Sequence, residues 1–126
     1  MPKETVHRML VQVSRDDVEG MNLALNNLMA GYRLFGSRGE DFQAELVAFG
    51  PGITMLRDDK SPVKDRIEST RKAIPNLVLS MCGNAKAAAE EREGHPITPL
   101  PGVGVVPSGV VRVMELQEQG WTYIRP

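Results

Sequence analysis

The chain has 126 residues, a size typical of one domain that buries a hydrophobic core without disulfides or metals. Hydrophobic residues make up 41%, charged residues make up 25%, and the formal net charge is −1, so the sequence indicates no basic surface for direct nucleic-acid binding. A single cysteine excludes an internal disulfide, and no apolar run is long enough to cross a membrane.

The first residues also lack the layout of a signal peptide. We therefore expect a cytoplasmic protein without a membrane segment, in which residues 1–126 form one domain.

The first half of the chain alternates between strand and helix patterns. Residues 6–14 and 42–49 have the dense apolar content of strands that are covered on both faces. Between them, residues 17–35 place apolar side chains at helical spacing, and Asp16 or Asp17 is suited to cap the start of that helix.

Three asparagines interrupt this first helix, at Asn22, Asn26 and Asn27. Asn22 and Asn26 are four residues apart and share a face. Because asparagine is a poor helix former, this polar stripe has a reason other than helix stability. Asn26 and Asn27 either satisfy local hydrogen bonds, lie at the edge of the sheet where a ligand binds, or lie in a contact between subunits.

A turn of two glycines around a proline follows the second strand, at Gly50, Pro51 and Gly52. Such a turn either lines a pocket through close backbone approach or simply ends the strand. It lacks the Lys-Ser/Thr pair of a phosphate-binding loop.

A second helix follows, with Ser61 at its predicted N-cap and Pro62 at its first position, and Pro75 stops it. Residues 76–82 are the third strand. Residues 84–93 are a short third helix. Its inward residues are predicted to be Ala85, Ala88 and Ala89.

A proline-rich loop over residues 96–102 precedes a short fourth strand at 103–106, and Ser108 is suited to cap a fourth helix. The inward face of that helix is predicted to carry Val110, Val113, Met114 and Gln117. Residues 121–125 are the fifth strand. Strictly alternating strands and helices predict an α/β fold with three layers, a mostly parallel five-stranded sheet, and helices on both faces.

The only cysteine, Cys82, lies where the third strand meets the third helix. In an open parallel sheet, this edge is where ligands bind, and a helix start favours a thiolate. Lys86, one turn further on, adds positive charge. Cys82 is therefore either a nucleophile or a small buried hydrophobic residue.

Gly83 and Asn84 lie at the start of the predicted third helix (residues 84–93), where their backbone and amide donors are placed to hold an anion; the simpler interpretation is that Asn84 caps the helix. If the second and third strands are neighbours, Gly50–Pro51–Gly52 lies beside Cys82 at the same edge.

The two histidines suggest no catalytic pair. His7 is placed at the opposite edge of the sheet, and His95 lies in a loop, either as a mobile base or as an exposed residue. Two histidines and one distant cysteine do not make a metal-binding pattern, so we expect no metal and no cofactor.

Five short runs together resemble the DsrE/DsrF-like family: residues 23–27 (LALNN), 47–52 (VAFGPG), 82–85 (CGNA), 106–110 (VPSGV) and 116–124 (LQEQGWTYI). This resemblance implies a five-stranded parallel α/β/α fold and assembly into trimers or hexamers. In family members that work in sulfur relays, a cysteine after the third strand carries sulfur as a persulfide. Cys82 matches that position.

Two hypotheses for function follow. In the first, the protein is a sulfur carrier or sulfurtransferase-related protein whose acceptor is Cys82, and a sulfur-relay partner protein or a small thiol removes the sulfur. In the second, it is a non-catalytic oligomeric module that binds a small anion or a protein at the same edge. The apolar residues of the last quarter of the chain favour a homo-oligomer in both cases.

Overall fold

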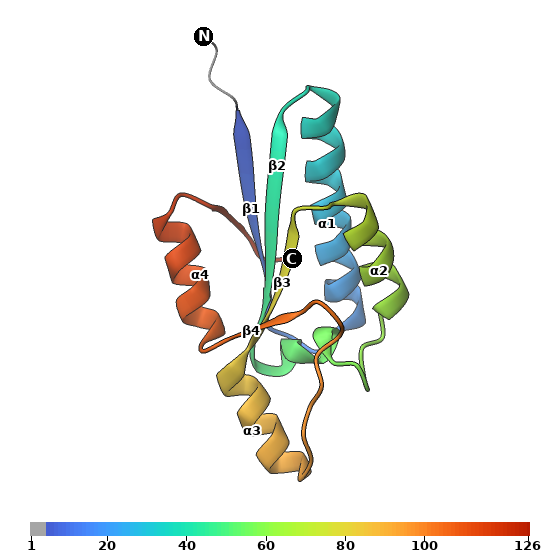
Figure 1. Cartoon of the computed structure of the whole chain (residues 1–126), viewed down its shortest axis with the longest axis vertical. Coiled ribbons are helices and arrows are strands. Elements are labelled where there is room, and N and C mark those ends of the chain that lie inside the picture. Colours follow the sequence, from blue (N-terminus) through green and yellow to red (C-terminus); the bar gives the residue numbers. More distant parts are fainter. Residues whose placement is uncertain (1–4) are drawn as a thin grey trace.

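The structure is a computed structural model that describes residues 5–126, and the other four residues of the predicted domain lie outside the described part. It contains one sheet of five parallel strands in the order β4-β3-β2-β1-β5 (Figure 1). The strands are β1 (Val6–Val13), β2 (Asp41–Ala48), β3 (Leu77–Cys82), β4 (Gly104–Val106) and β5 (Thr122–Ile124).

Helices cover the two faces of the sheet unequally. The helical elements are α1 (Val18–Ser37), the 3-10 helix η1 (Gly50–Leu56), α2 (Lys64–Ala73), α3 (Gly83–Glu93) and α4 (Gly109–Glu118). α1 and α2 lie on one face and α4 lies on the other, while α3 projects beyond the carboxyl edge of the sheet (Figure 1). The predicted three-layer α/β fold with a parallel five-stranded sheet is therefore confirmed.

The alternation of side chains along β2 explains the two cores. Phe42, Ala44, Leu46 and Ala48 contribute to the larger core, which includes the buried face of α1. Val47 points the other way, into a smaller core that also contains Leu10, Val113 and Leu116. β1 and β2 are thus covered on both faces along most of their length, as their apolar sequences predict.

The strand order follows from the handedness of the crossovers. From β1 to β4 the chain adds each strand next to the preceding one, and it then returns through α4 to place β5 beside β1. A right-handed crossover in the reverse direction requires α4 to lie on the opposite face from α1 and α2.

The start of α2 differs from the sequence prediction. The helix begins at Lys64, and Val63 occupies the N-cap without a side-chain hydrogen bond. Ser61 is instead part of a turn, because its backbone N–H donates to the Arg57 carbonyl and its hydroxyl accepts from the Val63 N–H. The turn that Arg57 begins therefore delays the helix beyond Ser61 and Pro62.

Two predictions of inward-facing residues are wrong. Ala88 is exposed because α3 extends past the sheet, and Ala89 is the buried alanine of this helix. On α4, Met114 and Val110 are 54% and 56% exposed and Gln117 is also exposed, because no helix packs beside α4 in the described part of the chain; Val113 alone of the four is buried.

Candidate functional site

Cys82 ends β3 and is also the N-cap of α3. Its Sγ accepts a hydrogen bond from the Ala85 backbone N–H at 3.4 Å, and the first turn of α3 contains no acidic residue. The predicted junction of strand and helix is confirmed. The predicted cap is wrong: Cys82 caps the helix, whereas Asn84 lies inside the first turn and is exposed.

The thiol of Cys82 is nevertheless buried, and the residue is 6% exposed and belongs to the larger core. The first residue of α4, Gly109, packs against Cys82 at its Cβ. A Cβ atom on Gly109 would lie 3.1 Å from the Cys82 Cβ and 2.7 Å from the Phe49 Cβ. Only a residue without a side chain allows α4 to begin this close to Cys82 and Phe49.

The junction also passes close to the end of β4. A Cβ atom on Gly83 would lie 2.9 Å from the Val106 carbonyl oxygen. After β3 the chain enters α3, and after β4 it crosses to α4 on the other face of the sheet (Figure 1). Cys82 therefore lies at the carboxyl edge where successive connections leave in different directions, which is where open α/β sheets bind ligands.

Lys86, which was predicted to add positive charge near the thiol, forms an ion pair with Glu90 instead. Its Nζ lies 2.9 Å from Glu90 Oε2, one turn further along α3. The pKa of Glu90 is below its ordinary value, first because the Ile97 backbone N–H donates to it and second because of Lys86. The positive charge of Lys86 is thus paired away from Cys82, and the polar contact of the sulfur comes from the backbone of α3.

The Gly50–Pro51–Gly52 turn begins η1 and packs against the end of β1. A Cβ atom on Gly52 would lie 2.2 Å from the Val13 carbonyl oxygen and 2.9 Å from the Ser14 Cα. β2 and β3 are neighbours, as the prediction required, but the turn leads the chain toward β1. Phe49, just before the turn, packs against Gly109, which also packs against Cys82.

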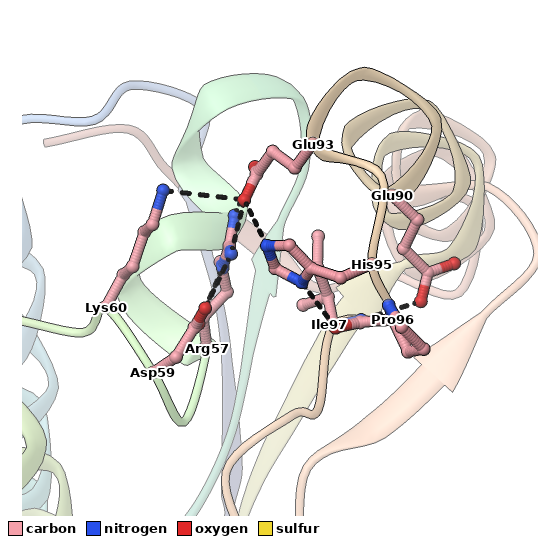
Figure 2. Close-up of polar contacts among 8 residues, drawn as sticks. All are labelled: Arg57, Asp59, Lys60, Glu90, Glu93, His95, Pro96 and Ile97. Carbon is pink, nitrogen blue, oxygen red and sulfur yellow. Dashed lines mark hydrogen bonds and ion pairs between the residues drawn. The ribbon is translucent and has the colours of Figure 1, made fainter.

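The far end of α3 is held by a cluster of charged residues around Arg57 (Figure 2). The Arg57 side chain is 3% exposed and donates two hydrogen bonds to Glu93, at 2.7 and 2.8 Å, and two to Asp59, at 2.9 and 2.8 Å. These contacts lower the pKa of Glu93 to about 2 and also lower the pKa of Asp59. We call these three residues the Arg57 clamp.

Both histidines lie away from the thiol. His95 Nε2 is 3.3 Å from Glu93 Oε1 and His95 Nδ1 is 2.9 Å from the Pro96 carbonyl oxygen, so this exposed histidine sits beside the clamp (Figure 2). The 11-residue α3 separates it from Cys82 by about 16 Å. His7 stacks on Phe35 at 3.6 Å and contacts Glu40, at the opposite edge of the sheet.

A cavity of about 720 Å³ opens elsewhere on the carboxyl edge, at the end of β1. Its walls are the residues that follow β1, the first turns of α1, and Arg125 after β5; Cys82 does not line it. Asn26 does line it, together with Asn22. Of the predicted site residues, the structure therefore places Asn26 at this cavity, and Cys82 and Gly83 at the separate β3–α3 junction.

The sequence analysis missed the arginines of this region. Arg15 and Arg125 line the cavity, and Arg66 of α2 donates to the side-chain oxygens of Asn22 and Asn26, each at 2.9 Å. The Asn22–Asn26 pair is a signal for Arg66 alone, since two amides on one helix face suit one shared polar partner.

Among residues 5–126, no group of three or more His, Cys, Asp or Glu side chains is arranged to hold a metal ion. The helices in that part of the chain include none that is long and apolar enough to cross a membrane.

No known family model and no curated protein matches this chain. Among solved structures, the chain is similar to MTH1491, a protein of unknown function from Methanobacterium thermoautotrophicum, with a TM-score of 0.77 and 28% sequence identity. The similarity covers 95% of this chain and 99% of MTH1491. The two proteins therefore share the fold over essentially their whole lengths.

Proposed function

We propose that the protein is a sulfur carrier or sulfurtransferase-related protein of the DsrE/DsrF-like type, in which Cys82 accepts sulfane sulfur as a persulfide. The observation that carries this proposal is the position of the thiol at the N-cap of α3, where Sγ accepts the Ala85 N–H. Backbone donors and the positive end of a helix stabilise an anionic sulfur, whether thiolate or persulfide.

The proposed step is a displacement at sulfur. The Cys82 thiolate attacks the sulfane sulfur of thiosulfate or of a polysulfide, and the new S–S bond forms as the old one breaks. The leaving group, sulfite or a shortened polysulfide, departs with the electron pair, and Cys82 is left as a persulfide anion. Because the described chain has no second cysteine, a relay partner protein or a small thiol removes the sulfur.

The burial of Cys82 sets a condition on this reaction. A residue that is 6% exposed meets a donor only when neighbouring residues move, and Gly109, the first residue of α4, is one of these neighbours. We therefore expect acceptance to be slower than for a fully exposed thiol, with a rate that reports the opening of the Cys82–Gly109 contact.

The test is intact-mass spectrometry after incubation of the reduced, folded protein with thiosulfate or polysulfide. The expected result is the gain of one sulfur atom, which is removed by dithiothreitol and is absent from the Cys82→Ser variant. Because Cys82 is the only cysteine, no other thiol contributes to the signal. An unchanged mass under native conditions contradicts the proposal.

The second candidate is a non-catalytic oligomeric module that binds a small anion or a protein at the carboxyl edge. The observation that favours it is the same burial, since a small core cysteine needs no chemical role. Labelling with a thiol reagent separates the candidates: a carrier reacts in the folded state, whereas a structural cysteine reacts only after unfolding.

In both cases we propose a cytoplasmic homo-oligomer. A reduced cytoplasm keeps a lone thiol free, and a trimer or hexamer would cover the exposed apolar side chains of α4.

A further inference from the structure

The cavity at the end of β1 lies on the edge of the sheet where ligands of parallel α/β folds bind. It is separate from the β3–α3 junction, because β2 lies between β1 and β3. Its volume of about 720 Å³ is within the range of pockets that take small metabolites.

Two asparagines of α1 line this cavity and have hydrogen-bond donors that are free within the described chain. Asn22 and Asn26 line it, and the oxygen of each side-chain amide accepts a hydrogen bond from the Arg66 guanidinium. With both oxygens held by Arg66, the NH₂ groups turn away from that arginine, and neither has a partner among the described residues. Arg66 thus fixes the orientation of two donors on one helix face.

Two arginines supply positive charge to the same cavity. Arg15 follows β1 and Arg125 follows β5, so the two residues reach the cavity from the ends of neighbouring strands. Neither makes an ion pair within residues 5–126. A guanidinium binds phosphate oxygens through paired, charge-assisted hydrogen bonds.

The remaining walls suit the rest of a polar molecule. The carboxylates of Asp17 and Glu19 accept hydrogen bonds from hydroxyl groups, and the exposed side of Leu23 offers an apolar surface. Asp17 keeps one oxygen on the Gly20 N–H, so its second oxygen is available to a ligand.

From these contacts, we infer that the cavity binds a small organic phosphate monoester whose carbon skeleton carries hydroxyl groups. The phosphate is held by Arg15 and Arg125 and by the amides of Asn22 and Asn26, and the hydroxyls face the carboxylates. This inference is independent of the role of Cys82, and the Cys82→Ser variant is expected to bind the same ligands.

The test measures binding by titration calorimetry, with ribose 5-phosphate and adenosine monophosphate as the organic probes and inorganic phosphate as the minimal one. We expect saturable binding of an organic phosphate at sub-millimolar concentration and weaker binding of inorganic phosphate. The Arg15→Gln/Arg125→Gln double variant should bind the organic phosphate roughly ten-fold or more weakly, because it loses the charged donors.

Asn26→Asp is the sharper variant. An aspartate keeps an oxygen for Arg66, and so keeps the contact between α1 and α2, but it replaces the NH₂ donor with a negative charge. Phosphate binding should weaken roughly ten-fold without loss of thermal stability. Arg33→Gln, on the same helix but outside the cavity, is the control and should bind as wild type.

The inference is overturned if no organic phosphate binds at millimolar concentration, or if Asn26→Asp and the double arginine variant bind as tightly as wild type. It is also overturned if inorganic phosphate binds as well as the organic probes, since the rest of the cavity then contributes nothing.

Discussion

Gly52 leaves no room for a side chain at the point where η1 crosses the end of β1. The atoms that a Cβ would meet, at 2.2 and 2.6 Å, are the carbonyl oxygen and carbon of Val13, which belong to a central strand. Because backbone atoms of a central strand cannot move aside as a flexible side chain can, Gly52→Ala should lower the free energy of unfolding by about 1–3 kcal/mol. Urea unfolding followed by circular dichroism measures this change.

Gly36→Ala is the matched control for Gly52→Ala. Gly36 lies in the last turn of α1, and nothing is within 4 Å of the Cβ that alanine would add. Alanine is the better helix former, so this variant should be more stable by about 0.5–1 kcal/mol. Equal effects at Gly36 and Gly52 would contradict the close packing of the turn on β1.

At the scale of elements, the Arg57 clamp joins the end of η1 to the end of α3 (Figure 2). Glu93 has a pKa of about 2 in the folded protein against an ordinary value of 4.5, because it accepts hydrogen bonds from Arg57. A carboxylate whose pKa is lowered on folding contributes stability above its unfolded pKa and loses it as the pH falls. The clamp therefore stabilises the fold at neutral pH and weakens between about pH 4.5 and 2.

We expect the thermal midpoint of the wild-type protein to fall over that acidic range, partly through Glu93. Glu93→Gln should lower the midpoint at pH 7 and reduce the further loss between pH 4.5 and 2. Glu68→Gln is the control, since Glu68 only forms an exposed pair with Lys72 at 3.9 Å. An acid profile of Glu93→Gln that is parallel to wild type would show that Glu93 is not the titrating group.

Elements were predictable where a local pattern defines them. The apolar density of β1, β2 and β3, the Asp17 cap of α1 and the Ser108 cap of α4 are all visible within a few residues of sequence. The position of Cys82 at a strand–helix junction was predictable for the same reason. These features depend on neighbours in the chain, and tertiary packing then preserves them.

The interactions that shape the candidate sites were not predictable in this way, because they join distant residues. Arg57 and Glu93 are 36 positions apart, and Arg66 and Asn22 are 44 positions apart. Cys82 packs against Gly109, which is 27 positions further along the chain. One sequence without related sequences contains no periodic signal for such pairs.

At the scale of the whole molecule, one face of the sheet remains partly open. α4 is the helix that covers it in Figure 1, and Ser80 on that face is buried while Val78, two residues earlier on the same face, is 48% exposed. α4 itself exposes Val110 at 56%, Val111 at 47% and Met114 at 54%. Apolar groups gathered on one face of a small protein are typical of a surface that a partner covers.

We therefore predict that a second copy of the chain packs against α4. Sedimentation velocity should give a species larger than a monomer for wild type, and Val110→Glu/Met114→Glu should shift it to a folded monomer, because the two charges would be buried in the contact. Leu34→Glu, at a 53% exposed position of α1 on the opposite face, should leave the assembly intact. A monomeric wild-type protein, or an assembly that dissociates in Leu34→Glu but not in Val110→Glu/Met114→Glu, would contradict the prediction that α4 forms the contact between copies.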